Sequence, residues 1–215
     1  MKNSECFKTE INYIFNDTLR KIVEETLDAA PDYIQTIPAS STGKYHPSYS
    51  LGEGGLMRHV QAAVRIARSL CQTDNFKNIV FKRDNIINDA DFVNKLQMYR
   101  DCAYAALILH DCRKADDTPK HNTRFDHPLL AAKLFKETAK KYITNDNLEY
   151  MKVVIPLVYN AIASHMGEWN TASYMPNVTL PKPACGLDDF VHLCDYLGSR
   201  RFLEFDFVKF DETGR

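Results

Sequence analysis

The sequence lacks a large net charge of either sign, a long hydrophobic run and a signal peptide. It balances 27 basic against 28 acidic residues over 215, so its net charge of −1 gives no overall attraction to nucleic acid or to an anionic membrane. No apolar run approaches the roughly 20 residues that a membrane-spanning helix needs. The first ten residues, MKNSECFKTE, contain no apolar signal-peptide core. These absences predict a cytoplasmic protein with no membrane partner.

Closely spaced cysteine pairs are also missing. None of the six cysteines forms a C-x-x-C motif, the spacing typical of zinc sites and thiol redox centres. Most of them lie in apolar segments with helical spacing, where a reduced cysteine packs as a small hydrophobic side chain. Any metal site in this protein is therefore expected to use ligands other than thiolates.

Alternating β-patterns are nearly absent, and only residues 203–210 (LEFDFVKF) could form one short strand. Helical spacing of apolar residues recurs over 11–30, 56–71, from Asp89 to about 112, 128–142, 147–166 and 187–205. A polar stretch separates the second of these helices from the third, and Pro156 is expected to kink or split the helix over 147–166. The sequence thus predicts an all-α fold with one domain over residues 1–215. Its core would be a helical bundle over about 45–205, with the helix over 11–30 packed on it.

Several of the predicted helices carry a possible metal ligand near an end or a loop. These ligands are His59, His110, Asp111, His165 and Asp195, and His127 stands where a polar loop meets the next helix. When thiolates are absent, imidazoles and carboxylates are the ligands of Zn, Mn, Fe, Co or Ni. Helical bundles build metal sites from such inward-facing side chains. A His-Asp dipeptide by itself is close to a chance event in this composition, so its meaning depends on the other ligands.

The segments around these ligands resemble the HD superfamily of metal-dependent phosphohydrolases, in its two-metal form H…HD…H…H…D. The matching segments are HPSYSLGEGGLMRHV (46–60), HDCRK (110–114), RFDHPLLAAKLF (124–135), SHMGEW (164–169) and LPKP…VHLCDYLGSRR (180–201). The last two are similar to the HD module of bacterial 3′–5′ exoribonucleases and of phage HD proteins. The resemblance covers about residues 45–205 and implies a single HD-domain helical bundle.

The resemblance also implies roles for individual residues. Two divalent ions (Mn, Fe, Ni, Co, Zn or Mg) would be bound by His59, His110, Asp111, His127, His165 and Asp195, with Asp111 bridging them. Asp111 and Lys114 would be catalytic, Lys114 as a cation beside the phosphoryl group. Arg58, His46, Lys120, Arg124 and Arg200 are the candidate substrate-binding residues.

The implied reaction is hydrolysis of a phosphoester or phosphoanhydride bond in a nucleotide or at the end of a short oligonucleotide, without stable binding of duplex nucleic acid. Two features depart from the family pattern: Cys112 and Arg113 replace the usual Ile-Gly after the His-Asp pair, and no GYP motif follows it, which argues against a cyclic di-GMP phosphodiesterase. Three alternatives remain open: a 3′–5′ exoribonuclease-like nuclease, a di-iron HD oxygenase and a non-catalytic nucleotide sensor. The near-zero net charge and the lack of an added nucleic-acid module favour a small nucleotide.

Overall fold

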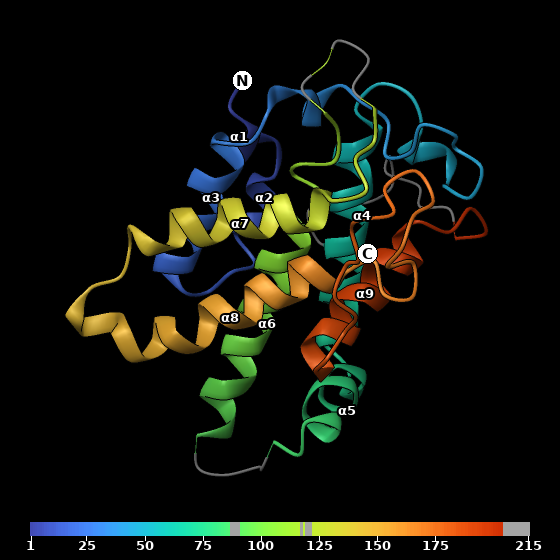
Figure 1. Ribbon diagram of the computed structural model, residues 1–215. Coiled ribbons are helices and arrows are strands. Elements are labelled where there is room, and N and C mark those ends of the chain that lie inside the picture. The colour runs from blue at the N-terminus through green and yellow to red at the C-terminus, as the bar shows by residue number, and fades with distance from the viewer. Residues whose placement is uncertain (87–90, 117, 119–121, 204–215) are drawn as a thin grey trace.

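The computed structural model describes residues 1–86, 91–116, 118 and 122–203, and these residues are helical without a β-strand (Figure 1). The helices are α1 (Asn3–Cys6), α2 (Lys8–Ile11), α3 (Asp17–Asp28), α4 (Gly55–Cys71), α5 (Asp74–Arg83), α6 (Phe92–Leu109), α7 (His127–Lys140), α8 (Leu148–Ser164) and α9 (Gly186–Gly198). Short 3₁₀ turns, η1 (Asp32–Gln35), η2 (Ser48–Ser50) and η3 (Asn145–Asn147), lie between them. The predicted all-α class is confirmed.

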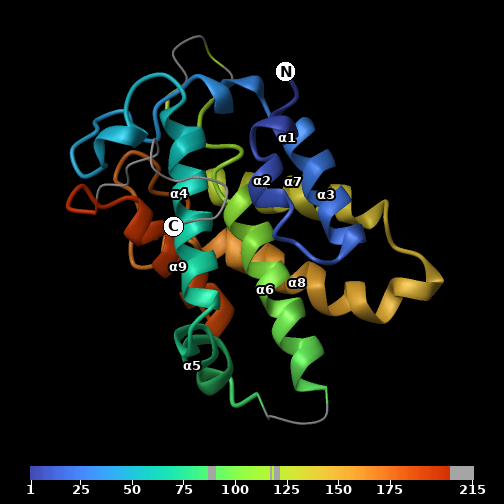
Figure 2. The same ribbon diagram turned by 180° about the vertical axis from the view of Figure 1, so that it is seen from behind.

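Helix α6 lies at the centre of the bundle. It contacts α3, α4, α8 and α9, and Figures 1 and 2 show α4 and α9 to one side of it and α3 and α7 to the other. Every residue from Asp101 to Cys112 is buried, as expected for a helix that is surrounded by others. One contiguous cluster of buried apolar side chains runs from Phe7 to Cys194. The end of α6, where His110 and Asp111 stand, is therefore deep in the protein.

The N-terminal segment differs from the prediction of one helix over 11–30. Helix α3 starts only at Asp17, and the chain turns between α2 and α3. The Asn16 side chain accepts a hydrogen bond from the Leu19 amide and so caps α3. The buried Asp101 carboxylate of α6 accepts the amides of Phe15 and Asn16, at 2.9 and 2.8 Å. This tertiary contact fixes a turn that local periodicity does not reveal.

Two further features differ from the prediction. No helix was predicted for the polar stretch after residue 71, but this stretch contains α5, which Thr73 caps and which buries Phe76 and Val80. The helix predicted over 187–205 ends at Gly198, where the Ser199 hydroxyl donates to the Tyr196 carbonyl. Helix α8 runs through Pro156 without a split. Apart from Leu203, the predicted strand over 203–210 lies outside the described residues.

All six cysteines lie within the described residues and are free thiols. Burial raises the pKa of Cys71 to about 11 and that of Cys112 to about 12, so both thiols stay protonated at neutral pH. Within the described part of the chain, no helix is both long and apolar enough to cross a membrane.

Candidate metal centre

The packing of five helices brings all six predicted metal ligands together. His110 follows the last residue of α6, His165 follows that of α8, and His127 begins α7. His59 comes from α4 and Asp195 from α9. Five of the six form two closely spaced groups that share His110, namely His59–His110–Asp195 and His110–Asp111–His165, and within each group the ligand atoms lie within 4.8 Å of one another. These buried groups could hold a metal ion.

Three of the four imidazoles are oriented by backbone carbonyls three residues before them. Nδ1 of His110 bonds to the Leu107 carbonyl, Nδ1 of His127 to the Arg124 carbonyl, and Nδ1 of His165 to the Ile162 carbonyl, at 2.6–2.8 Å. Because a carbonyl oxygen only accepts, each Nδ1 must carry the proton. In the neutral ring, Nε2 then offers a lone pair. Such an outer hydrogen bond is how proteins fix the tautomer of a metal-binding histidine.

His127 and His165 face each other across one oxygen of Asp111. Their Nε2 atoms are 3.3 Å apart and lie 2.9 and 3.6 Å from Asp111 Oδ1. Burial lowers the pKa of His127, and Lys114 adds to this effect; burial, followed by the charge at His110, lowers the pKa of His165 to about 3. Both rings are therefore neutral at neutral pH. Three acceptor atoms point at one another with no proton between them, and a cation relieves the resulting repulsion.

His59, His110 and Asp195 form the other half of the cluster. The Nε2 atoms of the two histidines are 3.4 Å apart and lie 3.0 and 3.5 Å from Asp195 Oδ1. The second oxygen of Asp111, Oδ2, is 3.7 Å from His59 Nε2 and 3.5 Å from His110 Nε2. The Asp111 carboxylate thus faces both halves of the cluster, one oxygen to each.

The spacing of the ligand atoms fits metal coordination. A transition-metal ion holds nitrogen and oxygen ligands at about 2.0–2.2 Å. Neighbouring ligand atoms are then about 3.0 Å apart in an octahedral site and about 3.4 Å apart in a tetrahedral one. The observed separations of 2.9–3.7 Å fall around these values. His59 Nδ1 is buried with no hydrogen-bond partner among the described residues, so this ring is the least firmly oriented of the four.

The cluster also favours positive charge electrostatically. Burial would raise the pKa of Asp111, but Lys114 and the rings of His110 and His127 hold it well below its usual range. Burial would likewise raise the pKa of Asp195, but His110 and His59 lower it strongly. Burial lowers the pKa of His110, yet Asp111 and Asp195 together raise it above its ordinary value. Two ionised carboxylates in a buried centre therefore attract protons or metal ions.

Lys114 contacts the Asp111 carboxylate, which faces both halves of the ligand cluster. Its Nζ lies 3.0 and 2.9 Å from the two oxygens of Asp111. The turn that carries Lys114 is fixed by Tyr33, whose hydroxyl donates to the Ala115 carbonyl and accepts from the Ala115 amide, at 2.8 and 3.1 Å. Sequence analysis missed Tyr33, because nothing in the loop around it signals a contact 82 residues away.

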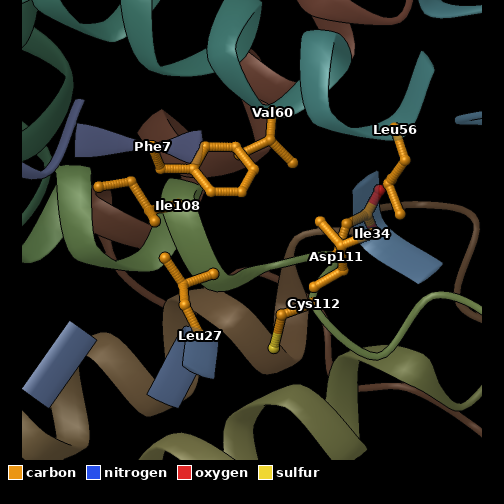
Figure 3. Close-up of a pocket in the computed structure, with 8 residues that line it drawn as sticks. All are labelled: Phe7, Leu27, Ile34, Leu56, Val60, Ile108, Asp111 and Cys112. Carbon is orange, nitrogen blue, oxygen red and sulfur yellow. The ribbon is translucent and has the colours of Figure 1, made fainter. Parts of the chain in front are cut away.

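An apolar layer packs around Asp111 and Cys112. Figure 3 shows six side chains in this layer: Phe7, Leu27, Ile34, Leu56, Val60 and Ile108. The space between them is too narrow for a water molecule. Cys112, which departs from the family pattern, is part of this layer and is 2% exposed. The Cys112 side chain therefore packs within this layer and helps to exclude water from this side of Asp111.

Two of the predicted substrate-binding residues lie beside the ligand cluster. The His46 ring is 5.7 Å from the His59 ring, centroid to centroid. Burial, followed by His59 and Lys114, lowers the pKa of His46 to about 4. Arg200 lies over the rings of Tyr196 and Trp169, and Tyr196 directly follows Asp195 in α9.

The other predicted substrate-binding residues are engaged elsewhere or lie outside the described residues. Arg58 donates to the carbonyls of Tyr49, Leu51 and Glu53 and so secures the loop before α4. Arg124 forms a two-pronged ion pair with Asp126 at 2.8 and 2.6 Å, next to His127. Lys120 is not among the described residues. Contact of any of these residues with a substrate stays a prediction.

No protein-family model, curated protein or solved structure matches this chain. The resemblance to the HD superfamily therefore remains a prediction from the motifs, and the functional argument rests on the geometry of the ligand cluster.

Proposed function

We propose that this protein is a metal-dependent phosphohydrolase of the HD type, with two divalent ions bridged by Asp111. Its substrate would be a nucleotide or the end of a short oligonucleotide, and the bond cleaved a phosphoester or a phosphoanhydride. His59, His110 and Asp195 would bind one ion, and His127 and His165 the other.

One observation carries this proposal: two pairs of Nε2 atoms face each other at 3.4 and 3.3 Å, on opposite oxygens of a single buried carboxylate. A structural histidine cluster would pair each ring with a donor or an acceptor of its own. Here the Nδ1 protons of three rings are already bonded to carbonyls, so the Nε2 atoms are left to bind cations. The order of the ligands along the chain, which resembles the HD pattern, supports the same interpretation.

The side chains around the cluster have distinct tasks in this mechanism. Bound divalent ions would supply Lewis acidity and a water activated at neutral pH. Lys114, held beside Asp111, would neutralise charge that develops on a phosphoryl oxygen. The Asp195 side chain is 17% exposed, whereas those of the other five ligands are 0–2% exposed, so substrate would approach from the Asp195 side.

The ligand set also narrows the choice of metal. Mg²⁺ prefers oxygen ligands and retains several waters, whereas imidazole nitrogen suits metals such as Zn, Fe and Ni. Four of the six ligands are histidines. We therefore propose a transition-metal ion rather than Mg²⁺ as the resident metal.

The test is metal analysis of the purified protein, followed by assays on nucleoside triphosphates, monophosphates, cyclic dinucleotides and short RNA. We expect close to two transition-metal ions per chain and hydrolysis of at least one nucleotide class. Asp111→Asn should lose both metal and hydrolysis. Asp74→Asn, whose side chain is 85% exposed, is the matched control and should keep both.

The outcomes separate the alternatives. Full metal content and full hydrolysis in Asp111→Asn would refute the proposal. One ion per chain, unchanged by His127→Ala or His165→Ala, would reduce the centre to a mononuclear site. Bound iron with oxygen consumption and no hydrolysis would indicate the oxygenase, and nucleotide binding without turnover would indicate the sensor.

A further inference from the structure

A stacked aromatic pair, Trp169 and Tyr196, lies next to the ligand cluster. The two rings are parallel within 5°, with centroids 5.7 Å apart. The Arg200 guanidinium lies 4.1 Å from the Tyr196 centroid and 5.4 Å from the Trp169 centroid. Offset stacking of this kind holds each ring in a fixed plane.

The pair is joined directly to metal ligands. Tyr196 follows Asp195 in α9, and Trp169 stands four residues after His165. His192, one helical turn before Tyr196, hydrogen-bonds through Nδ1 to the His165 carbonyl at 2.7 Å. The stacked aromatic pair is thus positioned by the same helix and turn that position two of the ligands.

The turn between His165 and Trp169 has little freedom. Gly167 has a φ of +59°, and a Cβ on it would lie 2.3 Å from Cε1 of His192. The chain therefore packs tightly against α9 at this point, and only glycine fits. Trp169 is held in place before any ligand arrives, which lowers the entropic cost of binding to it.

Trp169 is nevertheless 43% exposed. Tyr196 lies parallel to the ring, the His192 ring lies 5.9 Å from it and Arg200 lies over it, so the exposed part is what these three side chains leave uncovered. Buried packing, the more frequent role of a tryptophan, does not account for such exposure. A rigid indole face with an arginine beside it is a typical surface for stacking a nucleobase near a phosphate. Tyr196 directly follows Asp195, the most exposed of the six predicted ligands, so the pair adjoins in the chain the residue from whose side substrate would approach.

We propose that Trp169, supported by Tyr196, stacks on the nucleobase of the substrate, while Arg200 contributes positive charge beside it. This inference rests on the proposed function and extends it, because it assigns to the protein a preference for nucleotides over phosphate esters that lack a base. In this proposal Arg200 acts next to the base rather than at the metal ligands.

The chain contains a single tryptophan, so its fluorescence reports on this position alone. The wild-type, metal-loaded protein is mixed rapidly with AMP, GMP, CMP or UMP, and the signal is read before turnover. We expect saturable quenching by at least one of these nucleotides and none by ribose 5-phosphate. If no nucleotide quenches the fluorescence, or if ribose 5-phosphate quenches it equally, the proposal is overturned.

Variants provide a second readout, by calorimetric titration of the nucleotide that quenches. Trp169→Ala should weaken its binding by about 5- to 150-fold, the range expected for loss of one base–aromatic stack, with Trp169→Phe retaining most of the affinity. Phe15→Ala removes another exposed aromatic (75% exposed) far along the chain and should leave binding unchanged.

Ribose 5-phosphate distinguishes a stacking role from a structural one. Its affinity should be the same in the wild type and in Trp169→Ala. An equal loss for both ligands would mean that Trp169 only supports the fold, which would overturn the inference. Metal content and hydrolysis of the nucleotide panel are measured in parallel: the absence of both refutes the proposed phosphohydrolase, whereas their presence without a preference for nucleotides over ribose 5-phosphate refutes only the role of Trp169.

Discussion

At the scale of single residues, Tyr33 joins the loop before α4 to the turn that follows Asp111. Its hydroxyl is the hydrogen-bond partner of both the amide and the carbonyl of Ala115. A buried backbone group that loses its partner costs far more than an exposed one. Tyr33 therefore positions Lys114 indirectly, without touching a metal ligand in the contacts described above.

Tyr33→Phe is expected to lower the free energy of unfolding by about 1–3 kcal/mol, because it leaves both Ala115 groups unpaired. The measurement is urea unfolding followed by circular dichroism. Tyr142→Phe is the control: its hydroxyl bonds to Glu25 near the surface, and its loss should cost about 0.5 kcal/mol or less. Equal losses in the two variants would contradict this role for Tyr33.

The residues that converge in the cluster were predictable from the sequence as candidate ligands, whereas the residues that orient them were not. Imidazoles and carboxylates at the ends of apolar helices can be recognised as possible ligands from the sequence alone. The carbonyl that orients His110, by contrast, belongs to Leu107, and any residue type could supply it. Tyr33 lies in a loop without periodicity, so only the tertiary structure reveals it.

At the scale of elements, the first residue of α9 packs against α5 without room for a side chain. A Cβ on Gly186 would lie 2.5 Å from the Val80 carbonyl oxygen and 2.6 Å from that of Ile79. The Gly186 amide also donates to the Asp84 carboxylate at 2.9 Å. Both contacts fix the start of the helix that carries Asp195.

Gly186→Ala is expected to destabilise the protein by about 1–3 kcal/mol, the usual cost of overpacking. Gly198→Ala, at the other end of α9, is a matched control. Its Cβ would lie 3.4–3.5 Å from Ala63, an ordinary contact, so we expect no loss of stability. Thermal unfolding of both variants distinguishes the two positions, and the same melting temperature in both would contradict the close packing at Gly186.

The contact between the Asp101 carboxylate of α6 and the amides of Phe15 and Asn16 makes the stability of the protein depend on pH. Burial raises the pKa of Asp101, although the amides of Phe15 and Asn16 and the Gln97 side chain lower it. Its pKa is thus higher in the folded than in the unfolded chain, where it is about 3.9. The contribution of Asp101 to stability is then largest below that pH and falls as the pH rises through the folded pKa.

The side chain introduced by Asp101→Asn cannot ionise, so this variant should lack the part of the pH dependence of stability that comes from Asp101. The stability of the variant relative to the wild type is expected to increase as the pH rises from about 3.9 through the folded pKa, and to stay constant above it. Urea unfolding at a series of pH values measures the difference, with Asp74→Asn as an exposed control. A relative stability that decreases over this range would show that the sign is wrong.

Helix positions were predicted well where burial follows a local period and poorly where a distant contact decides. The helix around 56–71 agrees with α4, because its apolar residues repeat along one face. The start of α3 depends on Asp101, which is 85 residues away from Asn16. The presence of α5 depends likewise on packing between helices, in which Phe76 and Val80 are buried.

At the scale of the whole molecule, the ligand cluster connects most of the bundle. Its side chains come from α4 and α9 and from the ends of α6, α7 and α8. An ion that binds only the folded arrangement must therefore stabilise the packing of all five helices. The all-α class was predictable because the sequence nearly lacks alternating β-patterns. That the helix ends converge could be inferred only from the positions of the predicted ligands along the chain.

Removal of metal is expected to lower the melting temperature. An ion present at 1,000 times its Kd stabilises the folded state by about 4 kcal/mol. For a chain of this size that corresponds to a shift of about 8–16 °C. Thermal unfolding with and without a chelator measures the effect, and Asp111→Asn should show no shift. An unchanged melting temperature of the metal-loaded wild type after chelation would contradict the coupling.

Nδ1 of His110 and Nδ1 of His165 donate to the carbonyls of Leu107 and Ile162, which lie in the last turns of α6 and α8, where the helix itself supplies few amide donors. His110 and His165 therefore have to stand directly after the last residue of their helices. One residue inserted into or removed from either helix would rotate its ligand by about 100° and shift it by about 1.5 Å. The lengths of α6 and α8 are thus as much a part of the candidate metal centre as the histidines, and chains related to this one should vary in length in their loops rather than in these two helices.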